Sequence, residues 1–305
     1  MPTVKGGGIG NSMYLVIGAN GFLGSYVIKN ILENTEKNIL ATARNLKFCD
    51  NSGRVKWVSC EITNDSDIKN LIEEIDGNEI DVIYLSAYHK PDEVQENPRL
   101  AWDINIIALS KILNLLKNVR CFFYASTDSV YGNSIDGYHF KEEDRLSPEN
   151  IYGLQKKTAE ALVVGYGYNV VRYPFLIGKS LLKHKKHFYD LIAETISKGE
   201  SFDMFSDSYR SSLDFDTAAF LLIKLIEAYR EDYPKVLNIS GDKDLSKYDV
   251  GLLIAKHIGC NFDLIKPVSI EDKNKIFKSP RALSTLLDNS KLKSVLNLDE
   301  IVLKF

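Results

Sequence analysis

Short apolar runs alternate along the chain with longer stretches in which apolar residues recur at helical spacing. The short runs predict buried strands, and the helical recurrence predicts amphipathic helices. The predicted strands are Tyr14–Gly18, Asn38–Ala43, Val55–Ser59, Asp81–Ser86, Val119–Ser126, Asn169–Tyr173 and Lys235–Ser240. The predicted helices run to about Asn34 and over Ile68–Ile75, Pro98–Asn118, Ser147–Gly165 and Asp214–Tyr229. This alternation is typical of βαβ units, so the sequence predicts an α/β protein with a doubly wound parallel sheet, the Rossmann fold.

The alternation loosens after Tyr173, which predicts a second, smaller lobe. We expect a dinucleotide-binding Rossmann domain over residues 13–175, to which residues 213–240 return. The substrate-binding lobe is then discontinuous, over residues 176–212 and 241–305. Residues 1–12 contain a glycine cluster and no apolar signal core, so we expect a leader or a disordered tail there.

Composition excludes several classes of partner. The 305 residues are 45% hydrophobic and 26% charged, which suffices for a full core. A formal charge of −3 gives no reason to expect a nucleic-acid or membrane-surface partner. No apolar run approaches the roughly 20 residues that span a bilayer. The four cysteines lie far apart without a Cys-x-x-Cys pair, so we expect reduced thiols and a cytoplasmic protein.

A glycine-rich turn follows the first predicted strand and opens a helix, in the order Gly18-Ala19-Asn20-Gly21-Phe22-Leu23-Gly24. Glycines there permit a tight turn, and the amides at a helix N-terminus attract a diphosphate. A tight turn without a ligand is the plain alternative, but the βαβ context favours a dinucleotide. We therefore expect the cofactor to contact Gly18, Asn20, Gly21, Phe22, Leu23 and Gly24.

The second strand ends at Arg44, where an NAD-binding protein of this fold usually has an acid. Arginine pairs with a 2′-phosphate, so this position favours NADP(H), with NAD(H) as the alternative. A solvated basic loop is the competing interpretation. Glu61 and Ile62 follow the third strand, and the Glu61 carboxylate is placed to accept from the adenine amino group or to be an exposed strand-end acid.

Tyr152 and Lys156 lie four residues apart on a predicted helix and face the same way. We expect the Lys156 ammonium to lower the pKa of Tyr152 toward working pH and make it a proton donor. Alone, the pair is common on protein surfaces. It gains weight from Ser126-Thr127-Asp128-Ser129-Val130-Tyr131-Gly132, which directly follows the central strand, where ligands bind in this fold.

Together these three motifs resemble those of the extended short-chain dehydrogenase/reductase family, from Met13 onward. The resemblance implies that Tyr152 is the catalytic acid/base, that Lys156 holds the nicotinamide ribose, and that Thr127 bonds the reacting oxygen. It also implies cofactor contacts from Ser86, Ala87 and Tyr173.

Looser likenesses point to one branch of the family. The stretches Asp81–Tyr88, Leu237–Gly241 and Leu287–Leu292 are similar to the dTDP-4-dehydrorhamnose reductases, which reduce nucleotide-linked 4-keto-6-deoxy sugars with NADPH. The family's 4,6-dehydratases place Asp-Glu where this chain has Asp128-Ser129, so the base for dehydration is missing. No cysteine stands between Ser126 and Gly132, which argues against a combined epimerase and reductase. Arg210 before Leu213–Asp216 resembles an element of the 4-epimerases.

The sequence therefore predicts a reductase of a nucleotide-activated 4-keto-6-deoxy sugar, with an epimerase or a non-catalytic regulatory subunit as alternatives. The substrate is expected to contact Tyr88, Asp128, Ser129, Arg210 and Arg281. Residues 179–187 are basic, but we expect a solvated loop there. His184 and His187 have no cysteine or acidic ligand beside them, so no metal site is predicted. The resemblance also implies a homodimer, which the sequence itself does not establish.

Overall fold

The computed structural model describes residues 12–270 and 277–305, so the expected leader lies outside the described residues except for Ser12. A seven-stranded sheet forms the centre, in the order β12-β7-β5-β4-β1-β2-β3. Every neighbouring pair in it is parallel. The strands are β1 (Met13–Ile17), β2 (Asn38–Ala43), β3 (Val55–Ser59), β4 (Ile80–Tyr84), β5 (Val119–Thr127), β7 (Asn169–Tyr173) and β12 (Val236–Asn238). The predicted Rossmann sheet is confirmed.

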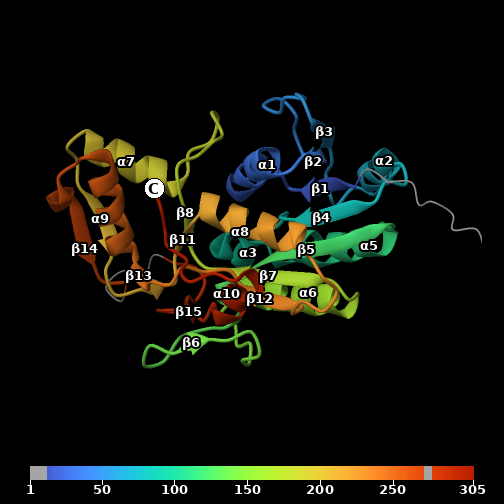
Figure 1. Cartoon of the computed structure of the whole chain (residues 1–305). Coiled ribbons are helices and arrows are strands. Elements are labelled where there is room, and N and C mark those ends of the chain that lie inside the picture. Colours follow the sequence, from blue (N-terminus) through green and yellow to red (C-terminus); the bar gives the residue numbers. More distant parts are fainter. Residues whose placement is uncertain (1–11, 271–276) are drawn as a thin grey trace, which may run out of the picture.

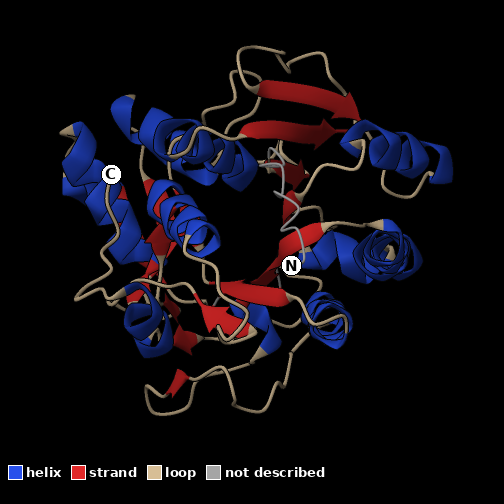
Figure 2. Ribbon diagram, turned by 45° about the vertical axis from the view of Figure 1, so that its right-hand side comes forward, coloured by secondary structure: helices blue, strands red, loops and turns tan. Residues whose placement is uncertain are grey.

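Helices cover both faces of this sheet, and each face has its own apolar core (Figures 1 and 2). On one face α1 (Phe22–Asn34) packs beside α8 (Phe215–Glu227). On the other lie α2 (Asp65–Ile75), α5 (Ala108–Leu115) and α6 (Ile151–Gly165). Successive residues of β1 point to opposite faces, so Tyr14 joins the first core and Leu15 the second. Burial on both faces explains why these strands are almost uniformly apolar.

The predicted helix Pro98–Asn118 is broken up. The chain forms α3 (Pro91–Glu96), α4 (Pro98–Trp102), a π-helical turn η1 (Asp103–Ile107) and then α5, which ends at Leu115. The π turn carries Asn105, whose side chain bonds both backbone groups of Tyr88 and the Gln155 amide. A π turn inside a helix often serves a local site, and here it fixes the backbone after β4.

The helix predicted from Ser147 begins later, at Ile151. Pro148 disfavours helical backbone at Ser147, and the side chain of Asn150 caps the helix by accepting from the Gly153 amide. The Asn64 side chain caps α2 by accepting from the Ser66 and Asp67 amides.

A separate apolar cluster joins α7 (Phe188–Ser197), α9 (Lys247–Ile258), β9 (Phe202–Phe205) and β14 (Ile265–Val268), at the left of Figure 1. The C-terminal segment packs outside this cluster. Leu292 of α10 (Ser290–Leu296) and Ile301 belong to the core that α1 and α8 form on the central sheet. The predicted lobe boundaries remain a prediction.

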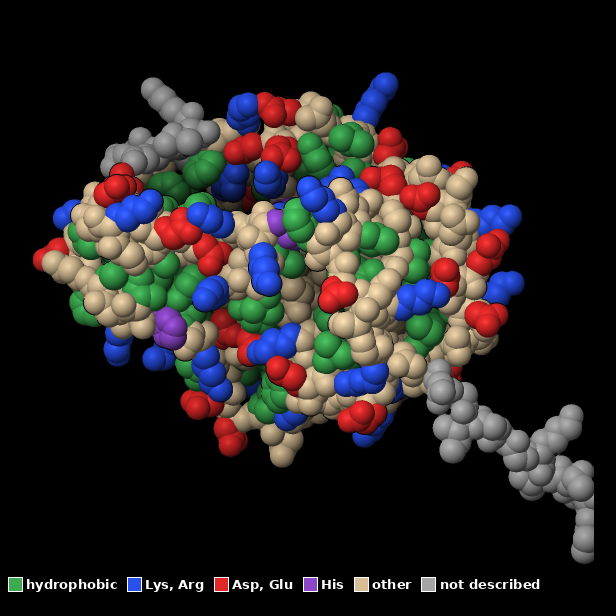
Figure 3. All heavy atoms as spheres, turned by 90° about the horizontal axis from the view of Figure 1, so that it is seen from above, with side chains coloured by type: hydrophobic (Ala, Val, Ile, Leu, Met, Phe, Trp, Pro, Cys, Tyr) green, Lys and Arg blue, Asp and Glu red, His purple; other side chains and the backbone are tan. Residues whose placement is uncertain are grey.

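Short elements complete the connections. They are β6 (His139–Phe140), β8 (Leu176–Ile177), β10 (Tyr209–Arg210), β11 (Leu213–Asp214), β13 (Leu245–Ser246), β15 (Leu286–Leu287) and the 3-10 turns η2 (Asp128–Val130) and η3 (Phe262–Leu264). None of the helices within the described residues is long and apolar enough to cross a membrane. Acidic and basic side chains are interspersed over the face shown in Figure 3.

Candidate active site

The glycine turn between β1 and α1 is closely packed. Gly18 has a φ of +82°, and a Cβ there would lie 2.6 Å from the Ser86 hydroxyl oxygen. A Cβ on Gly24 would lie 2.4 Å from the Ala19 carbonyl oxygen, so this glycine lets α1 approach the strand. Gly21 is the N-cap of α1 and provides no side-chain cap, which leaves the first helical amides facing outward. This cradle fits a dinucleotide diphosphate.

A groove with a volume of about 190 Å³ opens beside the turn, at the carboxyl ends of β1 to β4. It brings together many of the residues that the sequence predicted for the cofactor, together with Tyr88, which was predicted for the substrate. These are Gly18, Asn20, Gly21, Arg44, Glu61, Ile62, Ser86, Ala87 and Tyr88. Phe22, Leu23 and Gly24 do not line this groove but lie in the first turn of α1, directly after Gly21. The groove also includes His89, Thr42 and Lys185, which were not predicted as cofactor ligands.

Two polar side chains of the groove differ in their freedom to bind a ligand. Arg44 is exposed, and its guanidinium makes no hydrogen bond or ion pair with the described residues. The Glu61 carboxylate instead accepts from the Thr63 hydroxyl at 3.1 Å. Arg44 is therefore available to an anion, whereas Glu61 already has a local partner.

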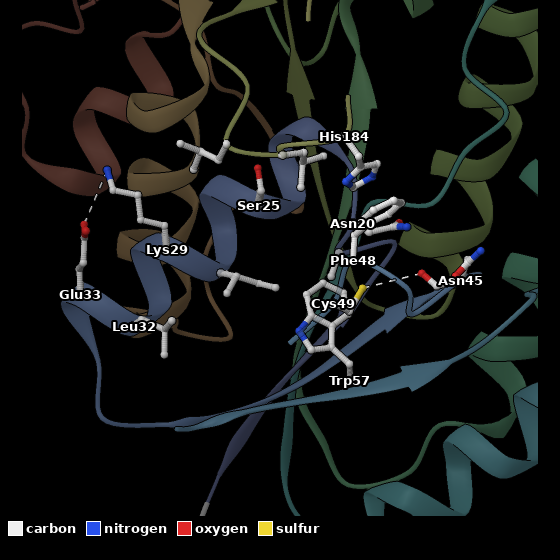
Figure 4. A pocket seen from close by; sticks show the side chains of 14 residues that line it. Asn20, Ser25, Lys29, Leu32, Glu33, Asn45, Phe48, Cys49, Trp57 and His184 are labelled. Carbon is white, nitrogen blue, oxygen red and sulfur yellow. Dashed lines mark hydrogen bonds and ion pairs between the residues drawn. The ribbon is translucent and has the colours of Figure 1, made fainter. Parts of the chain in front are cut away.

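Residues 179–187 form a strap that crosses from the smaller lobe to the glycine turn. The His184 ring stacks on Phe48, with centroids 4.0 Å apart and an interplanar angle of 11°. Figure 4 shows the two rings face to face near Asn20. Lys185 of the strap lies over the Phe22 ring and reaches the groove. The strap was expected to be a solvated loop, but these contacts place it against the glycine turn.

The turn after β5 and the start of α6 are in close contact. A Cβ on Gly153 would lie 2.5 Å from the Ser129 carbonyl oxygen, so only glycine allows α6 to approach η2 this closely. Thr127 caps η2 by accepting from the Ser129 amide, and its hydroxyl lies 3.1 Å from a carboxylate oxygen of Asp128. Gly153 directly follows Tyr152, and the approach therefore brings Tyr152 to the Thr127–Asp128 turn.

Lys156 takes a different partner from the one predicted. Its ammonium donates to the Ala125 carbonyl oxygen at 2.6 Å and lies 4.1 Å from the centre of the Tyr124 ring. Burial lowers the pKa of Lys156 to about 7, and the nearby Glu160 carboxylate opposes this shift. The Lys156 side chain is thus held against the last residues of β5.

The expected lowering of the Tyr152 pKa is wrong for this structure. Burial raises the pKa of Tyr152 above its usual value, and the Asp128 carboxylate raises it further. The Lys156 ammonium is directed to Ala125 and does not offset these two effects. The Tyr152 phenol is therefore neutral at physiological pH.

Asp128 is buried, and burial raises the pKa of its carboxyl against the opposing effects of Arg210, Thr127 and Ser129. One oxygen lies 3.4 Å from Nε of Arg210 and accepts no hydrogen bond from the described residues. The structure thus brings Asp128, Ser129 and Arg210, three of the residues predicted for the substrate, together beside Tyr152. Arg281 lies nearby and pairs with Asp92 at 3.0 Å.

Below this site, Glu160 and Arg172 form a buried ion pair. Arg172 bonds both Glu160 oxygens, the shortest distance being 2.6 Å, and donates to the Tyr131 hydroxyl. Glu160 also accepts from Ser126 at 2.5 Å. The pair supports the end of β5, and sequence reasoning missed it because both partners lie in apolar stretches. Tyr173 lies opposite Thr127 in the β5–β7 register, and its buried hydroxyl has no hydrogen-bond partner among the described residues.

Comparison with known proteins shows the family to which the chain belongs. A model described as the RmlD substrate binding domain matches residues 12–300. The chain belongs to the RmlD substrate binding domain family. RmlD-family membership agrees with the predicted resemblance to the extended short-chain dehydrogenases and the dTDP-4-dehydrorhamnose reductase branch.

Relatives of this RmlD-family chain differ in their described roles. Methionine adenosyltransferase 2 subunit beta of Xenopus laevis is 25% identical over 92% of this chain and 81% of its own. The probable low-salt glycan biosynthesis reductase Agl14 of Haloferax volcanii is 24% identical over 87% of both chains. The crystal structure of dTDP-4-dehydrorhamnose reductase from Bacillus anthracis in complex with NADP superposes with a TM-score of 0.77. It is 21% identical, covering 96% of this chain and 95% of its own, and supports the fold.

Proposed function

We propose that the chain is an NADPH-dependent reductase of a nucleotide-activated 4-keto-6-deoxy sugar. The observation that carries the proposal is the neutral phenol of Tyr152, held beside Thr127 and Asp128 by the close approach of α6 to η2. A reductase needs a proton donor at the carbonyl oxygen, and a phenol with a raised pKa is in the donor form.

The chain's own residues suit this reaction. The glycine turn and the unpaired Arg44 are suited to hold the diphosphate and the 2′-phosphate. When bound, NADPH supplies the hydride to the carbonyl carbon. In this proposal Thr127 orients the carbonyl oxygen, Tyr152 protonates it, and Lys156, held at the end of β5, binds the nicotinamide ribose.

The raised pKa of Tyr152 supports reduction over epimerisation. An epimerase of this kind begins by removing a hydroxyl proton, for which Tyr152 would have to be a phenolate. The neutral phenol favours the reductive direction. A binding subunit is the other candidate, because one relative is a subunit of methionine adenosyltransferase.

The test is to mix purified protein with NADPH and a panel of dTDP- and UDP-linked 4-keto-6-deoxy sugars and follow absorbance at 340 nm. Steady loss of absorbance with at least one sugar is expected. A matched Tyr152→Phe variant should lose about 100-fold or more in kcat while keeping its affinity for NADPH. Absence of turnover across the panel, or full activity of Tyr152→Phe, would contradict the proposal.

A further inference from the structure

Three cationic side chains face one another beside Asp128. Arg210 comes from β10, Arg281 from the segment before β15, and Lys247 is the first residue of α9. Strand β10 pairs with β13, where Arg210 lies opposite Leu245, and Lys247 directly follows β13. Arg281 lowers the pKa of Arg210, and both arginines lower that of Lys247. Asp128, which is paired with Arg210, also influences Tyr152. The cluster therefore lies next to the proposed reaction centre.

The two arginines already have protein partners. One terminal nitrogen of Arg210 donates to the carbonyl oxygens of Tyr209 at 2.7 Å and Leu283 at 2.9 Å. The other donates to Ala282 at 2.9 Å, and Nε faces Asp128. Most of the five N–H donors of Arg210 are thereby used.

Arg281 has one carboxylate partner and one aromatic contact. It donates to Asp92 at 3.0 Å, and its guanidinium lies 4.1 Å from the centre of the Phe277 ring. These contacts indicate that both arginines anchor the segment after residue 277 and supply positive potential. Arg210 has little donor capacity left for a bidentate grip on a ligand, whereas Arg281 is exposed and uses one of its five donors on Asp92.

Lys247 has no such partner. Its ammonium lies 5.1 Å and 5.7 Å from the ring centres of Phe175 and Phe188, and it makes no hydrogen bond or ion pair with residues 12–270 or 277–305. The nearest carboxylate on its helix, Asp249, is already bonded to Ser246 in the N-terminal capping box. Burial and the two arginines lower the pKa of Lys247 to about 8. A cation held among like charges, without a counter-ion in the described residues, suits an anionic ligand.

We propose that Lys247 is the principal phosphate-binding residue of the substrate site and contacts the diphosphate of a nucleotide sugar. The proposal rests on the proposed function only for the identity of this ligand. Arg210 pairs with Asp128, which lies in the turn that α6 approaches at Gly153, next to Tyr152. Leu245, two residues before Lys247, lies opposite Arg210 in the β10–β13 ladder, so a sugar carbonyl at Tyr152 leaves the diphosphate toward Lys247. Arg210 acts as a positioning residue, and Arg281 adds positive potential.

Isothermal titration calorimetry with dTDP-glucose and UDP-glucose tests this assignment on the full chain in the presence of NADPH. Lys247→Met keeps the apolar contact with the two rings and should weaken binding about tenfold or more. Lys247→Arg, which keeps the charge, should retain most of the affinity. Lys243→Met, an exposed lysine just before α9, is the matched control and should bind as the unchanged chain does.

A second readout is independent of how well the variants fold. A bound diphosphate raises the pKa of Lys247, so the unchanged protein should take up protons on binding at pH 8.5 and fewer at pH 6.5. Comparing buffers of different ionisation enthalpy measures this uptake, which Lys247→Met should abolish. Arg210 and Arg281 are the charged groups that act on Lys247, and they are paired with the carboxylates of Asp128 and Asp92, respectively.

The outcomes separate this inference from the proposed function. Lys247-dependent binding with proton uptake, but no NADPH oxidation on any keto sugar, leaves the inference standing and refutes the reductase. Equal affinity of Lys247→Met and the unchanged chain, no binding of either sugar nucleotide, or no proton uptake at pH 8.5 overturns the inference.

Discussion

The ammonium of Lys156 lies 2.6 Å from the carbonyl oxygen of Ala125, at the end of the central strand β5. The side chain is buried, so a positive charge is held where solvation by water is lost. This contact orients Lys156 toward the cofactor side of the site, at a cost in folding stability.

Lys156→Met should therefore stabilise the fold while impairing the site. The pKa of about 7 in the folded state lies below the ordinary lysine value. The penalty is thus complete below pH 7 and is relieved as the pH rises toward 10.5. At pH 7 the variant should gain about 1 to 3 kcal/mol in free energy of unfolding, a gain that shrinks by pH 10. Urea unfolding at several pH values measures it, and Lys157→Met, an exposed neighbour, should show no such gain.

Glu160→Ala should be strongly destabilising, because it leaves the Arg172 guanidinium buried without its carboxylate. Breaking one side of a buried pair costs about 3 to 5 kcal/mol. The double variant Glu160→Met with Arg172→Met should lose less than either single change. Glu74→Ala, which removes an exposed pair with Lys56, is the control and should cost less than about 1 kcal/mol. Equal effects at the two sites in urea unfolding would contradict the assignment.

Two glycines of the turn should separate folding from cofactor binding. Gly24→Ala places a Cβ 2.4 Å from the Ala19 carbonyl oxygen and should cost about 1 to 3 kcal/mol in unfolding free energy. Gly21→Ala meets only the Gly18 carbonyl oxygen, at 3.6 Å, and should cost less than about 1 kcal/mol. Because a methyl group there blocks the diphosphate, NADPH affinity should nevertheless fall about tenfold. Fluorescence titration with NADPH, beside thermal unfolding, distinguishes the two variants.

Arg44→Ala should weaken NADPH binding about tenfold and leave NADH binding nearly unchanged, because only NADPH carries the 2′-phosphate. The guanidinium has no partner among the described residues, so the change should not alter the unfolding temperature. Parallel titrations with both cofactors provide the measurement. An equal loss for NADH would show that Arg44 binds another part of the dinucleotide.

The sheet could be predicted because its pattern is local. Asn38–Ala43 and Val55–Ser59 match β2 and β3 residue for residue. Burial on both faces explains the mostly apolar run of β2, whereas β3 lies at the edge of the sheet and exposes Lys56 and Ser59. The glycine turn is equally local. The π turn around Asn105 could not be read in this way, because it depends on bonds to Tyr88 and Gln155.

The charged groups of the site were harder to predict than the fold. Arg210 was expected to contact the substrate, yet two of its bonds go to carbonyl oxygens more than 70 residues away, at Ala282 and Leu283. The partner of Lys156 depends on how α6 lies against β5, not on its spacing from Tyr152. Lys247 was not singled out, because its isolation among two rings and two arginines exists only in three dimensions.

The stack of Phe48 on His184 has a consequence for exchange kinetics. These rings join the strap to the loop after β2 beside Asn20, which lines the cofactor groove as well. We infer that a dinucleotide seated in the groove leaves when the rings separate, so loop opening should govern its residence time. Phe48→Ala should therefore speed NADP(H) dissociation in stopped-flow displacement more than it changes the equilibrium affinity.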